Sequence, residues 1–486
     1  MNMSVTISEE FAPIMQKCSK LTSSQADTSD KLQNLFQSID HLLVRLENSN
    51  PRVQSCFPLT YCIEEFVLEE YRSQVINIIG LIGTLSDQLP NIDILYALDW
   101  AQCHELYIVS SGVEIDDILG IKCLIDTYTG RMENALKNWM VNILNADFEE
   151  EPRVDTDGTL MTPGPQDLFR LLEEQLRVGE KGGTLLLKKV FQIATKLLQS
   201  YYEEYRARIK GSMNALETIC ALGNNCLRSK HLSESLMQSV KELVTRDEFL
   251  PLQFVPTPVP FDRLAEDLAR KSGSIVFLDP GFGELFPDLC SSEDWQAGLT
   301  IGSLLATLED FSRDLKDWLA PSLFRLAALS MLMECVSHYL AAMLCQLRHI
   351  YDATLHWLER DVRSVESFFK RLLDEDEIKK ETRVLHELCD FIAADSIESF
   401  VLAYSTLIDD VPITPLLLIG LLNARVATQH DMTKADIREV LTACREAFES
   451  KKPTAQHTDT EATNNSIKNT AYLAALSAVR QRSIAI

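Results

Sequence analysis

Apolar side chains recur every three or four residues along most of the chain, and this spacing is typical of one face of an α-helix. Three segments show it most clearly: Leu187, Val190, Ala194, Leu197, Tyr201 and Tyr205; Leu304, Leu308, Phe311, Leu315 and Trp318; and Leu355, Leu358, Val362, Val365, Phe368 and Leu372. Alternating strand patterns with hairpin turns are almost absent. The best strand candidate, 274–278, is equally a helix that ends before Pro280. The pattern therefore predicts an all-α protein.

The segment 138–175 has the features of a junction between two helices. The first helix ends near Asp147, and an acidic loop follows it, with Glu149, Glu150, Glu151, Asp155 and Asp157. The second helix begins with a capping residue, two prolines that preset φ and lack an amide hydrogen, and an acidic residue near the positive end of the helix dipole: Thr162, Pro163, Pro165 and Asp167. We predict a structural joint here rather than an active site.

Composition shifts and prolines divide the chain into six expected parts. Residues 1–60 are a polar, poorly ordered segment with a short helix near 31–46, and residues 61–148 are a first helical block. Three helical bundles follow: the second (160–255), the third (256–350) and the C-terminal bundle (351–450). Residues 451–486 are a flexible tail with a weak helix at 471–482. No repeat of fixed period connects the blocks. We expect successive helical bundles without close sequence repetition.

Composition and charge narrow the class of protein. Of the 486 residues, 46% are apolar and 24% are charged, as in soluble proteins with buried cores. The formal net charge of −25 repels phosphate backbones, so nucleic acid is not an expected partner. The twelve cysteines include no C-x-x-C pair, which favours thiols in a reducing compartment over a disulfide framework. Because the N-terminus also lacks the pattern of a signal peptide, we expect a cytoplasmic protein.

One apolar stretch, 326–347, is long enough to be compared with a membrane span, but Glu334 and His338 interrupt it, so we interpret it as a buried helix. Four residues in and after it resemble a metal quartet: Cys335, His338, Cys345 and His349. On one helix the outer two would be about 21 Å apart, because each residue adds about 1.5 Å. Zinc ligands must all lie about 2.0–2.3 Å from one ion. We therefore interpret the four as core-packing residues.

The other candidate constellations fail on spacing. His104-Glu105 has no second histidine four residues after the first, and Gly281-Phe282-Gly283 lacks the third glycine of a dinucleotide loop. We interpret the acidic runs 149–151 and 374–377 as solvated surface, with docking of a basic partner as the alternative. We interpret five basic residues as part of a mixed-charge helix surface, with binding of lipid headgroups as the alternative: Lys370, Arg371, Lys379, Lys380 and Arg383.

Three tyrosines on one helix, Tyr201, Tyr202 and Tyr205, are interpreted as core or interhelix packing rather than as a binding platform. With this reading, none of the constellations supports catalysis. We predict no catalytic, cofactor-binding or metal-binding residues, and the sequence does not identify the residues that contact a partner.

Six segments resemble, in the same order, segments of exocyst complex component three, the Sec-six family. They are Asp93–Trp100, Arg131–Asp147, Thr162–Phe169, Leu222–Arg228, Phe277–Gly281 and Ser396–Phe400, and the similarity spans roughly 65–450. The resemblance implies an elongated rod of consecutive helical bundles. It also implies a non-catalytic subunit without cofactors that assembles with the other exocyst subunits, tethers secretory vesicles at the plasma membrane and engages SNARE proteins before fusion.

By the same resemblance the protein is cytoplasmic, is recruited to plasma-membrane sites of exocytosis and associates peripherally with membranes through the complex. Members of the family usually have an extended N-terminal coiled coil that residues 1–60 do not resemble, so we expect a truncated form or a different assembly. Two alternatives remain open. One is a cytosolic helical-rod scaffold outside the exocyst, such as the tumour-necrosis-factor-induced paralogues. The other is an all-α enzyme with His104 and Glu105 in a deep pocket.

Overall fold

The computed structural model describes residues 3–18, 28–54, 56–108, 115–210, 215–246, 259–410, 418–428 and 433–450. Within these ranges almost every element is a helix, so the prediction of an all-α protein is confirmed. The chain divides into two compact units. Unit 1 contains residues 1–149, 163–209 and 229–259, and unit 2 contains residues 150–162, 210–228 and 260–486. Each unit is therefore assembled from segments that are separated along the chain.

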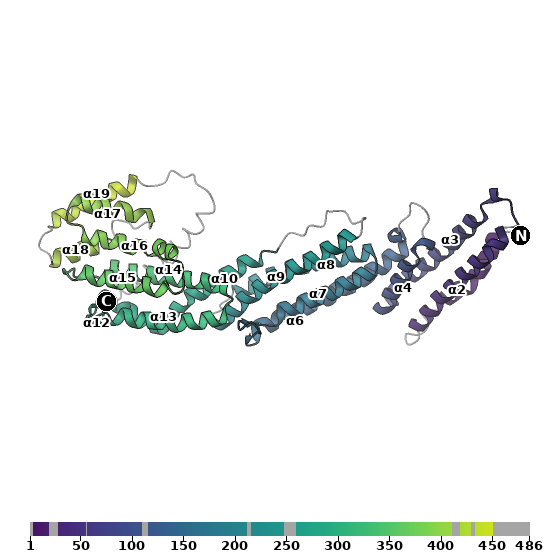
Figure 1. Ribbon diagram of the computed structural model, residues 1–486, viewed down its shortest axis with the longest axis horizontal. Coiled ribbons are helices and arrows are strands. Elements are labelled where there is room, and N and C mark those ends of the chain that lie inside the picture. Colours follow the sequence, from purple (N-terminus) through teal and green to yellow (C-terminus); the bar gives the residue numbers. More distant parts are fainter. Residues whose placement is uncertain are drawn as a thin grey trace. The chain divides into compact units, whose positions relative to one another are not determined.

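Unit 1 is a set of packed helices. Its elements are α1 (Met3–Cys18), α2 (Thr28–Gln54), η3 (Leu59–Tyr61), α3 (Ile63–Thr84), η4 (Ser86–Gln88), α4 (Asn91–Cys103), α5 (Glu105–Ile108), η5 (Ile115–Asp117), α6 (Leu119–Glu149), α7 (Gly164–Lys181), α8 (Thr184–Ile209) and the second part of α9 (Leu216–Arg246). The long helices α6, α7 and α8 contact one another and run side by side in Figure 1.

Unit 2 contains the remaining helices and a small hairpin. Its elements are β1 (Arg153–Val154), β2 (Leu160–Met161), the first part of α9, α10 (Phe261–Ile275), η6 (Val276–Leu278), α11 (Pro280–Leu285), η7 (Phe286–Asp288), α12 (Glu293–Gln296), α13 (Leu299–Trp318), α14 (Pro321–Gln346), α15 (Thr354–Phe369), α16 (Glu375–Ala393), α17 (Ile397–Asp410), α18 (Ile419–Thr428) and α19 (Lys434–Ser450).

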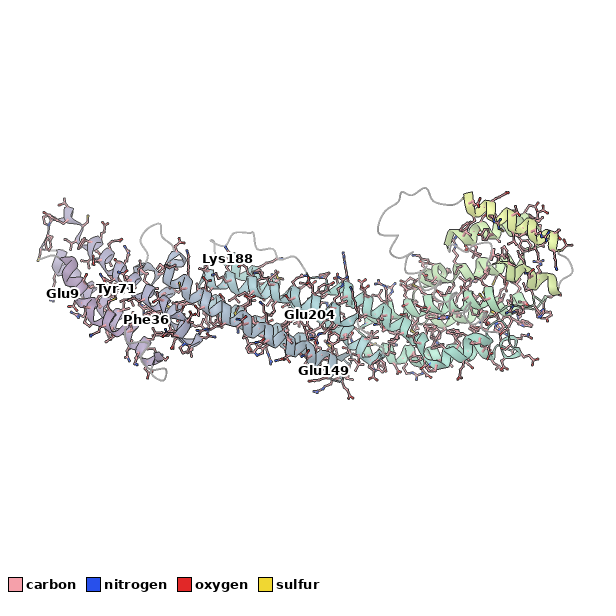
Figure 2. All side chains as sticks on the ribbon, turned by 180° about the vertical axis from the view of Figure 1, so that it is seen from behind. Glu9, Phe36, Tyr71, Glu149, Lys188 and Glu204 are labelled. Atoms are coloured by element: carbon pink, nitrogen blue, oxygen red, sulfur yellow. The ribbon has the colours of Figure 1, made fainter. Side chains whose placement is uncertain are left out.

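The apolar stripes predicted from the sequence face the cores of the two units. All six stripe residues of α8 are buried, from Leu187 to Tyr205. The polar residues of the same helix lie outside, as Figure 2 shows for Lys188 and Glu204. Along α9, residues 219–226 are all buried, so this part of the helix has no exposed side. A helix buried all round must satisfy its polar side chains internally.

The N-terminal segment differs from the expectation of a polar region with one short helix. It contains two helices, α1 and α2, and α2 extends well beyond the expected 31–46. The reason is an apolar spacing of three or four residues that buries Phe11 and Ile14 of α1 and Leu32, Leu35, Phe36 and Ile39 of α2. The rings of Phe11 and Tyr71 lie 5.7 Å apart, and Figure 2 labels Phe36 and Tyr71 in this core.

Of the two alternatives for residues 274–278, a strand or a helix that ends before Pro280, the structure has the second, as the end of α10 and the short helix η6. The position of the strands was not expected. Two strands of two residues each occur instead in the acidic segment, where Arg153 pairs with Met161 and Val154 with Leu160. Gly158, with a φ of 85°, allows the turn between them. The remaining expected divisions, at 148, 255, 350 and 450, stay predictions, and the expected helix at 471–482 lies outside the described residues.

Helix α14 is the one described helix that is long and apolar enough to span a membrane. In unit 2 it packs against α10, α13 and α16, and 61% of its apolar window is buried. Glycine permits its close contact with α10, because a Cβ on Gly273 would clash with the carbonyl oxygen of Ala327. These contacts favour the interpretation of a core helix.

Helices α3 and α6 of unit 1 also meet at glycines, and this contact predicts opposite effects of two neighbouring substitutions. A Cβ on Gly83 would lie 2.6 Å from the Cα of Gly120, whereas a Cβ on Gly80 has nothing within 4 Å. We expect Gly83→Ala to lower the free energy of unfolding by about 2 kcal/mol, because the backbones must separate. Gly80→Ala should raise it by up to about 1 kcal/mol, because alanine favours a helix. Urea denaturation measures both variants, and equal effects would contradict the close contact.

Candidate functional site

The four residues that resemble a metal quartet are not brought together. Cys335, His338 and Cys345 lie on α14, but this helix ends at Gln346 and His349 is exposed, so both the single helix and core packing are wrong for His349. Cys335 is buried, and the His338 ring stacks on Phe286 with 4.1 Å between ring centres. Across the described parts of the chain, no group of three or more His, Cys, Asp or Glu side chains is arranged to hold a metal ion.

His104 and Glu105 lie at the boundary between α4 and α5 rather than within one helix. The His104 imidazole stacks on Trp100 at 4.4 Å, and its Nε2 lies 3.1 Å from the carboxylate of Asp40 on α2. Trp100 Nε1 donates to the same carboxylate over 2.9 Å. This histidine therefore connects α4 to α2, which is a structural role.

The other candidate constellations also have structural places. Gly281 lies in the first turn of α11, where its N–H donates to the capping carboxylate of Asp279 over 2.8 Å. Tyr201 and Tyr205 are buried and their rings lie 5.5 Å apart, which confirms that they are core residues. In the second acidic run, Glu375 pairs with Lys370 and Lys379 at 3.5 and 3.1 Å. Hydrogen bonding from Lys379 lowers the pKa of Glu375.

All twelve cysteines lie in described segments, and none forms a disulfide. Burial raises the pKa of Cys220, Cys335 and Cys389 to about 12 in each case. A thiol with such a pKa is almost entirely protonated at neutral pH and is a poor nucleophile. These three side chains therefore act as small apolar core residues.

The start of α7 is capped by a residue that sequence reasoning did not select. Pro163, not Thr162, directly precedes the helix and makes no side-chain cap; instead, the N–H of Gly164 donates to the carboxylate of Asp147 over 3.1 Å. Asp147 is 1% exposed and also accepts from the hydroxyl of Tyr201 over 3.3 Å. Glycine is required at 164 because a Cβ there would clash with this carboxylate. Within unit 1, the last turn of α6 thus holds the first turn of α7 against α8.

Thr162 belongs to a second polar cluster, which lies in unit 2 and is centred on Asn224 and Asn225 of α9. Asn225 accepts from the backbone N–H of Thr162 over 3.1 Å and donates to its hydroxyl over 2.5 Å. Asn224 donates to the carbonyls of Leu160 and Trp318 over 2.8 and 2.7 Å, and accepts from the N–H of Ala320 over 3.0 Å. Two buried amides therefore hold the hairpin and the connection between α13 and α14 on α9.

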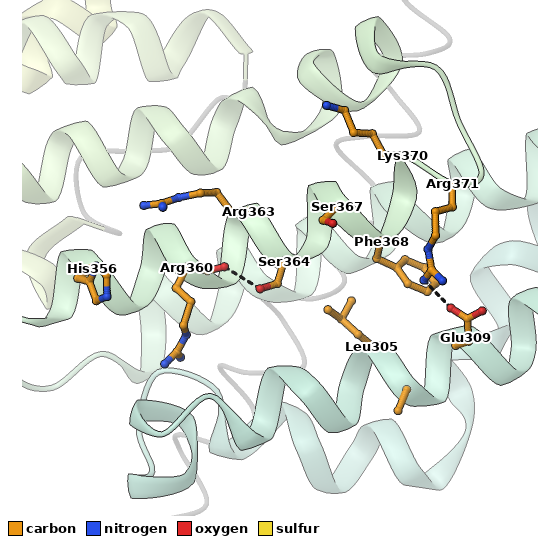
Figure 3. Close-up of a pocket in the computed structure, with 11 residues that line it drawn as sticks. Leu305, Glu309, His356, Arg360, Arg363, Ser364, Ser367, Phe368, Lys370 and Arg371 are labelled. Carbon is orange, nitrogen blue, oxygen red and sulfur yellow. Dashed lines mark hydrogen bonds and ion pairs between the residues drawn. The ribbon is translucent and has the colours of Figure 1, made fainter.

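A concave surface of unit 2 lies between α13 and α15 and has a volume of about 940 Å³. We call it the basic groove (Figure 3). Helix α13 contributes Leu305, Ala306 and Glu309. Helix α15 and the two residues after it contribute a histidine, four cations, two serines and an aromatic ring: His356, Arg360, Arg363, Ser364, Ser367, Phe368, Lys370 and Arg371.

Most of the cationic side chains in the basic groove are exposed and have exchangeable partners. Arg363 pairs with Glu359 at 2.7 Å, and Arg371 pairs across the groove with Glu309 at 2.5 Å. The Arg371 guanidinium also lies 5.1 Å from the centre of the Phe368 ring. The arginine side chains in these pairs are 64% and 58% exposed. Such exposed pairs contribute about 0–1 kcal/mol each, so a ligand can replace them at low cost.

Arg360 has a different role, because it is tied to a buried network beneath the basic groove. It donates to the carbonyls of Trp295 and Gln296 and to the carboxylate of Asp361, each over 2.9 Å. Asp361 is fully buried and also accepts from Trp295 Nε1 over 2.8 Å and from the Tyr339 hydroxyl over 2.9 Å. Burial raises the pKa of the Asp361 carboxyl, although its hydrogen-bond donors act in the opposite direction. This network fixes the position of α15 relative to α12 and α14.

The sequence pattern drew attention to Lys370 and Arg371 as basic surface residues but did not predict the basic groove. A signal was present, because His356, Arg360, Arg363, Ser367 and Arg371 follow a helical spacing of three or four residues opposite the apolar stripe of 355–372. The second wall could not be found in this way, since Glu309 lies 62 residues from Arg371 in the sequence.

Comparison with known proteins finds a family model and solved structures that match most of the chain. The family model described as exocyst complex component Sec6 matches residues 2–426, so the match begins well before residue 65, where we expected the similarity to start. Among solved structures, the C-terminal domain of the exocyst subunit Sec6p has a TM-score of 0.56 and 16% identity; the match covers 68% of this chain and 91% of that domain. M-Sec has a TM-score of 0.59 and 14% identity, with 93% of this chain and 78% of M-Sec covered. At these identities the two structures support the fold alone.

Proposed function

The chain belongs to the family of exocyst complex component Sec6, and from this membership we propose that it is a non-catalytic subunit of the exocyst, corresponding to component three, which tethers secretory vesicles to the plasma membrane. The observation that carries the proposal is the match of the family model over residues 2–426, which includes all the described helices up to α17 and most of α18. Its partners are the other exocyst subunits, and it engages SNARE proteins before fusion. It acts in the cytoplasm and at sites of exocytosis, with peripheral attachment to membranes through the complex.

The physical character of the chain supports a role in assembly. Its helices bury their apolar stripes within two units and leave polar sides that can pack against partner helices. The candidate catalytic and metal constellations have structural roles within the described residues, as His104 and His338 illustrate. A subunit that acts by binding other proteins requires rigid bundles with suitable surfaces and does not require a reactive site.

Native purification of the full chain with an affinity tag tests the proposal. We expect the other exocyst subunits to be recovered with it in comparable amounts, and depletion of the chain should cause secretory vesicles to accumulate near the plasma membrane. The SNARE step is tested separately, with the purified chain and purified SNARE proteins. Recovery without any other exocyst subunit would contradict the proposal and favour the alternative of a related cytosolic scaffold outside the exocyst.

A further inference from the structure

The basic groove between α13 and α15 carries an inference about a partner. We propose that it binds an acidic, extended peptide segment of a partner protein, in which two carboxylates flank an apolar side chain. This inference goes beyond the proposed function, because it concerns a binding surface of the chain itself and holds in or out of the exocyst. It rests on three properties of the groove: its charge, the exposure of its cations, and the distance between Arg363 and Arg371.

The charge of the groove is opposite to that of the protein. The chain as a whole has a formal net charge of −25, with 71 acidic and 46 basic residues. Among the lining residues of the groove, in contrast, four are arginine or lysine and one is glutamate, and the other carboxylates that pair with these cations, Glu359, Asp361 and Glu375, lie outside the lining. A concave surface of one sign concentrates ligands of the opposite sign. The groove therefore selects an anionic ligand that the rest of the chain repels.

The cations are available to such a ligand. Arg363, Lys370 and Arg371 have side chains that are 64%, 58% and 58% exposed, and they pair with Glu359, Glu375 and Glu309 of the same unit. Arginine guanidinium groups bind carboxylates through two parallel hydrogen bonds, so a peptide carboxylate can match what Glu359 and Glu309 now provide. Arg360 is reserved for the network around Asp361 and is not part of the proposed contact.

The separation of Arg363 and Arg371 fits an extended peptide. Arg363 lies in α15 and Arg371 lies two residues beyond the end of this helix, and the helical residues from Arg363 to Phe369 alone span about 9 Å. In an extended peptide, residues i and i+4 are about 13 Å apart and their side chains point to the same side as that of residue i+2. Carboxylates at i and i+4 can thus reach the two arginines while an apolar side chain at i+2 lies over Leu305 and Phe368, which line the groove between them.

A peptide fits this surface better than an anionic membrane does. Carboxylates lie close to the groove on the elements that border it: Glu359 and Glu375 pair with its cations, and Asp310 follows Glu309 on α13. A flat anionic bilayer would face all of these carboxylates together and be repelled. A narrow peptide meets only the lining of the groove.

The test uses the full chain and a short fluorescein-labelled peptide of glycine and serine that carries Glu, Leu and Glu at positions i, i+2 and i+4. Fluorescence anisotropy at low ionic strength should detect binding. In the double variant Arg363→Glu/Arg371→Glu the affinity should fall at least about tenfold, because two attractions become repulsions. The matched control, Lys380→Glu/Lys434→Glu, changes the net charge equally at exposed positions of α16 and α19 outside the groove, and should stay within about twofold.

Four results would overturn the inference. They are no peptide binding by the native chain, equal losses in the two double variants, equal binding of a scrambled peptide with adjacent glutamates, and groove-dependent binding to phosphatidylserine vesicles in place of the peptide. If circular dichroism shows that the charge reversal disturbs folding, Arg363→Gln/Arg371→Gln takes its place, with an expected loss of about threefold or more.

Discussion

Replacing Asp361 with alanine is expected to lower the free energy of unfolding of unit 2 by about 3 kcal/mol. The substitution leaves the Trp295 indole N–H and the Tyr339 hydroxyl buried without their common acceptor. Each such orphaned donor costs about 1–3 kcal/mol, and the lost volume adds a small cavity. Hydrogen exchange of amides in α12 and α15 reports the loss locally, which avoids assuming that the two units unfold together.

The control for this prediction is Asp361→Asn, which has the same shape and keeps one acceptor oxygen for Trp295 and Tyr339, while its NH2 group faces Arg360, a partly exposed side chain that can move away. Because burial raises the pKa of the carboxyl, the charged form is costly, and we expect the asparagine variant to lose less than about 1.5 kcal/mol. The pH dependence has a definite sign. A pKa raised in the folded state means that the native protein holds the proton more tightly than the unfolded chain does. The stability of the native protein relative to Asp361→Asn should therefore be greatest below about pH 4 and fall as pH rises through the folded pKa.

Equal losses in the alanine and asparagine variants would contradict this account, since they would show that the negative charge and not the acceptor geometry is what the network requires. A rise in relative stability between acidic and neutral pH would contradict it as well, because it would mean that the donors from Arg360, Tyr339 and Trp295 outweigh burial.

Asn224→Ala should have an effect of similar size. The substitution removes three hydrogen bonds and leaves the carbonyls of Leu160 and Trp318 and the N–H of Ala320 without the partner they now have. At about 1 kcal/mol for each bond, the expected loss is about 3 kcal/mol. The amides of the hairpin 153–161 should lose protection from hydrogen exchange first, because the hairpin is otherwise small.

Two further variants sharpen the test of Asn224. Asn224→Asp keeps the size and one acceptor but places a carboxylate against two carbonyls, so it should be at least as destabilising as alanine at neutral pH. Gln238→Ala removes an exposed side chain of the same helix and should change the free energy of unfolding by less than about 0.5 kcal/mol. Unchanged hairpin protection in Asn224→Ala would exclude the anchoring role.

The sequence predicts the helices well because their signal is local. The stripe from Leu187 to Tyr205 depends only on a repeat of three or four residues, and its members are buried as expected. The hairpin was missed although Asp157-Gly158 is a turn signal, because strands of two residues are too short to show alternation. The same periodic criterion, applied to residues 1–60, would have found the buried faces of α1 and α2.

The polar clusters and the groove were less predictable because their partners are distant in sequence. Thr162 was a reasonable cap by residue type, yet Asp147 caps α7 from the previous helix, 17 residues earlier. The Asn224 cluster joins positions 64, 94 and 96 residues apart. Periodicity places side chains on a face but does not say which other element will meet that face.

The three long-range bonds of Asn224 have a consequence for synthesis on the ribosome. The hairpin emerges with residue 162, but the backbone groups around residues 318–320 that share its anchor follow about 158 residues later. At 5–20 residues per second this interval lasts roughly 8–30 s. The helix segment 219–226, whose residues are all buried in the folded chain, is made within this interval, and it stays exposed to solvent while residues 227–320 follow, for roughly 5–19 s. Nascent chains that stop before residue 320 should therefore engage chaperones, and those that extend through α14 should release them.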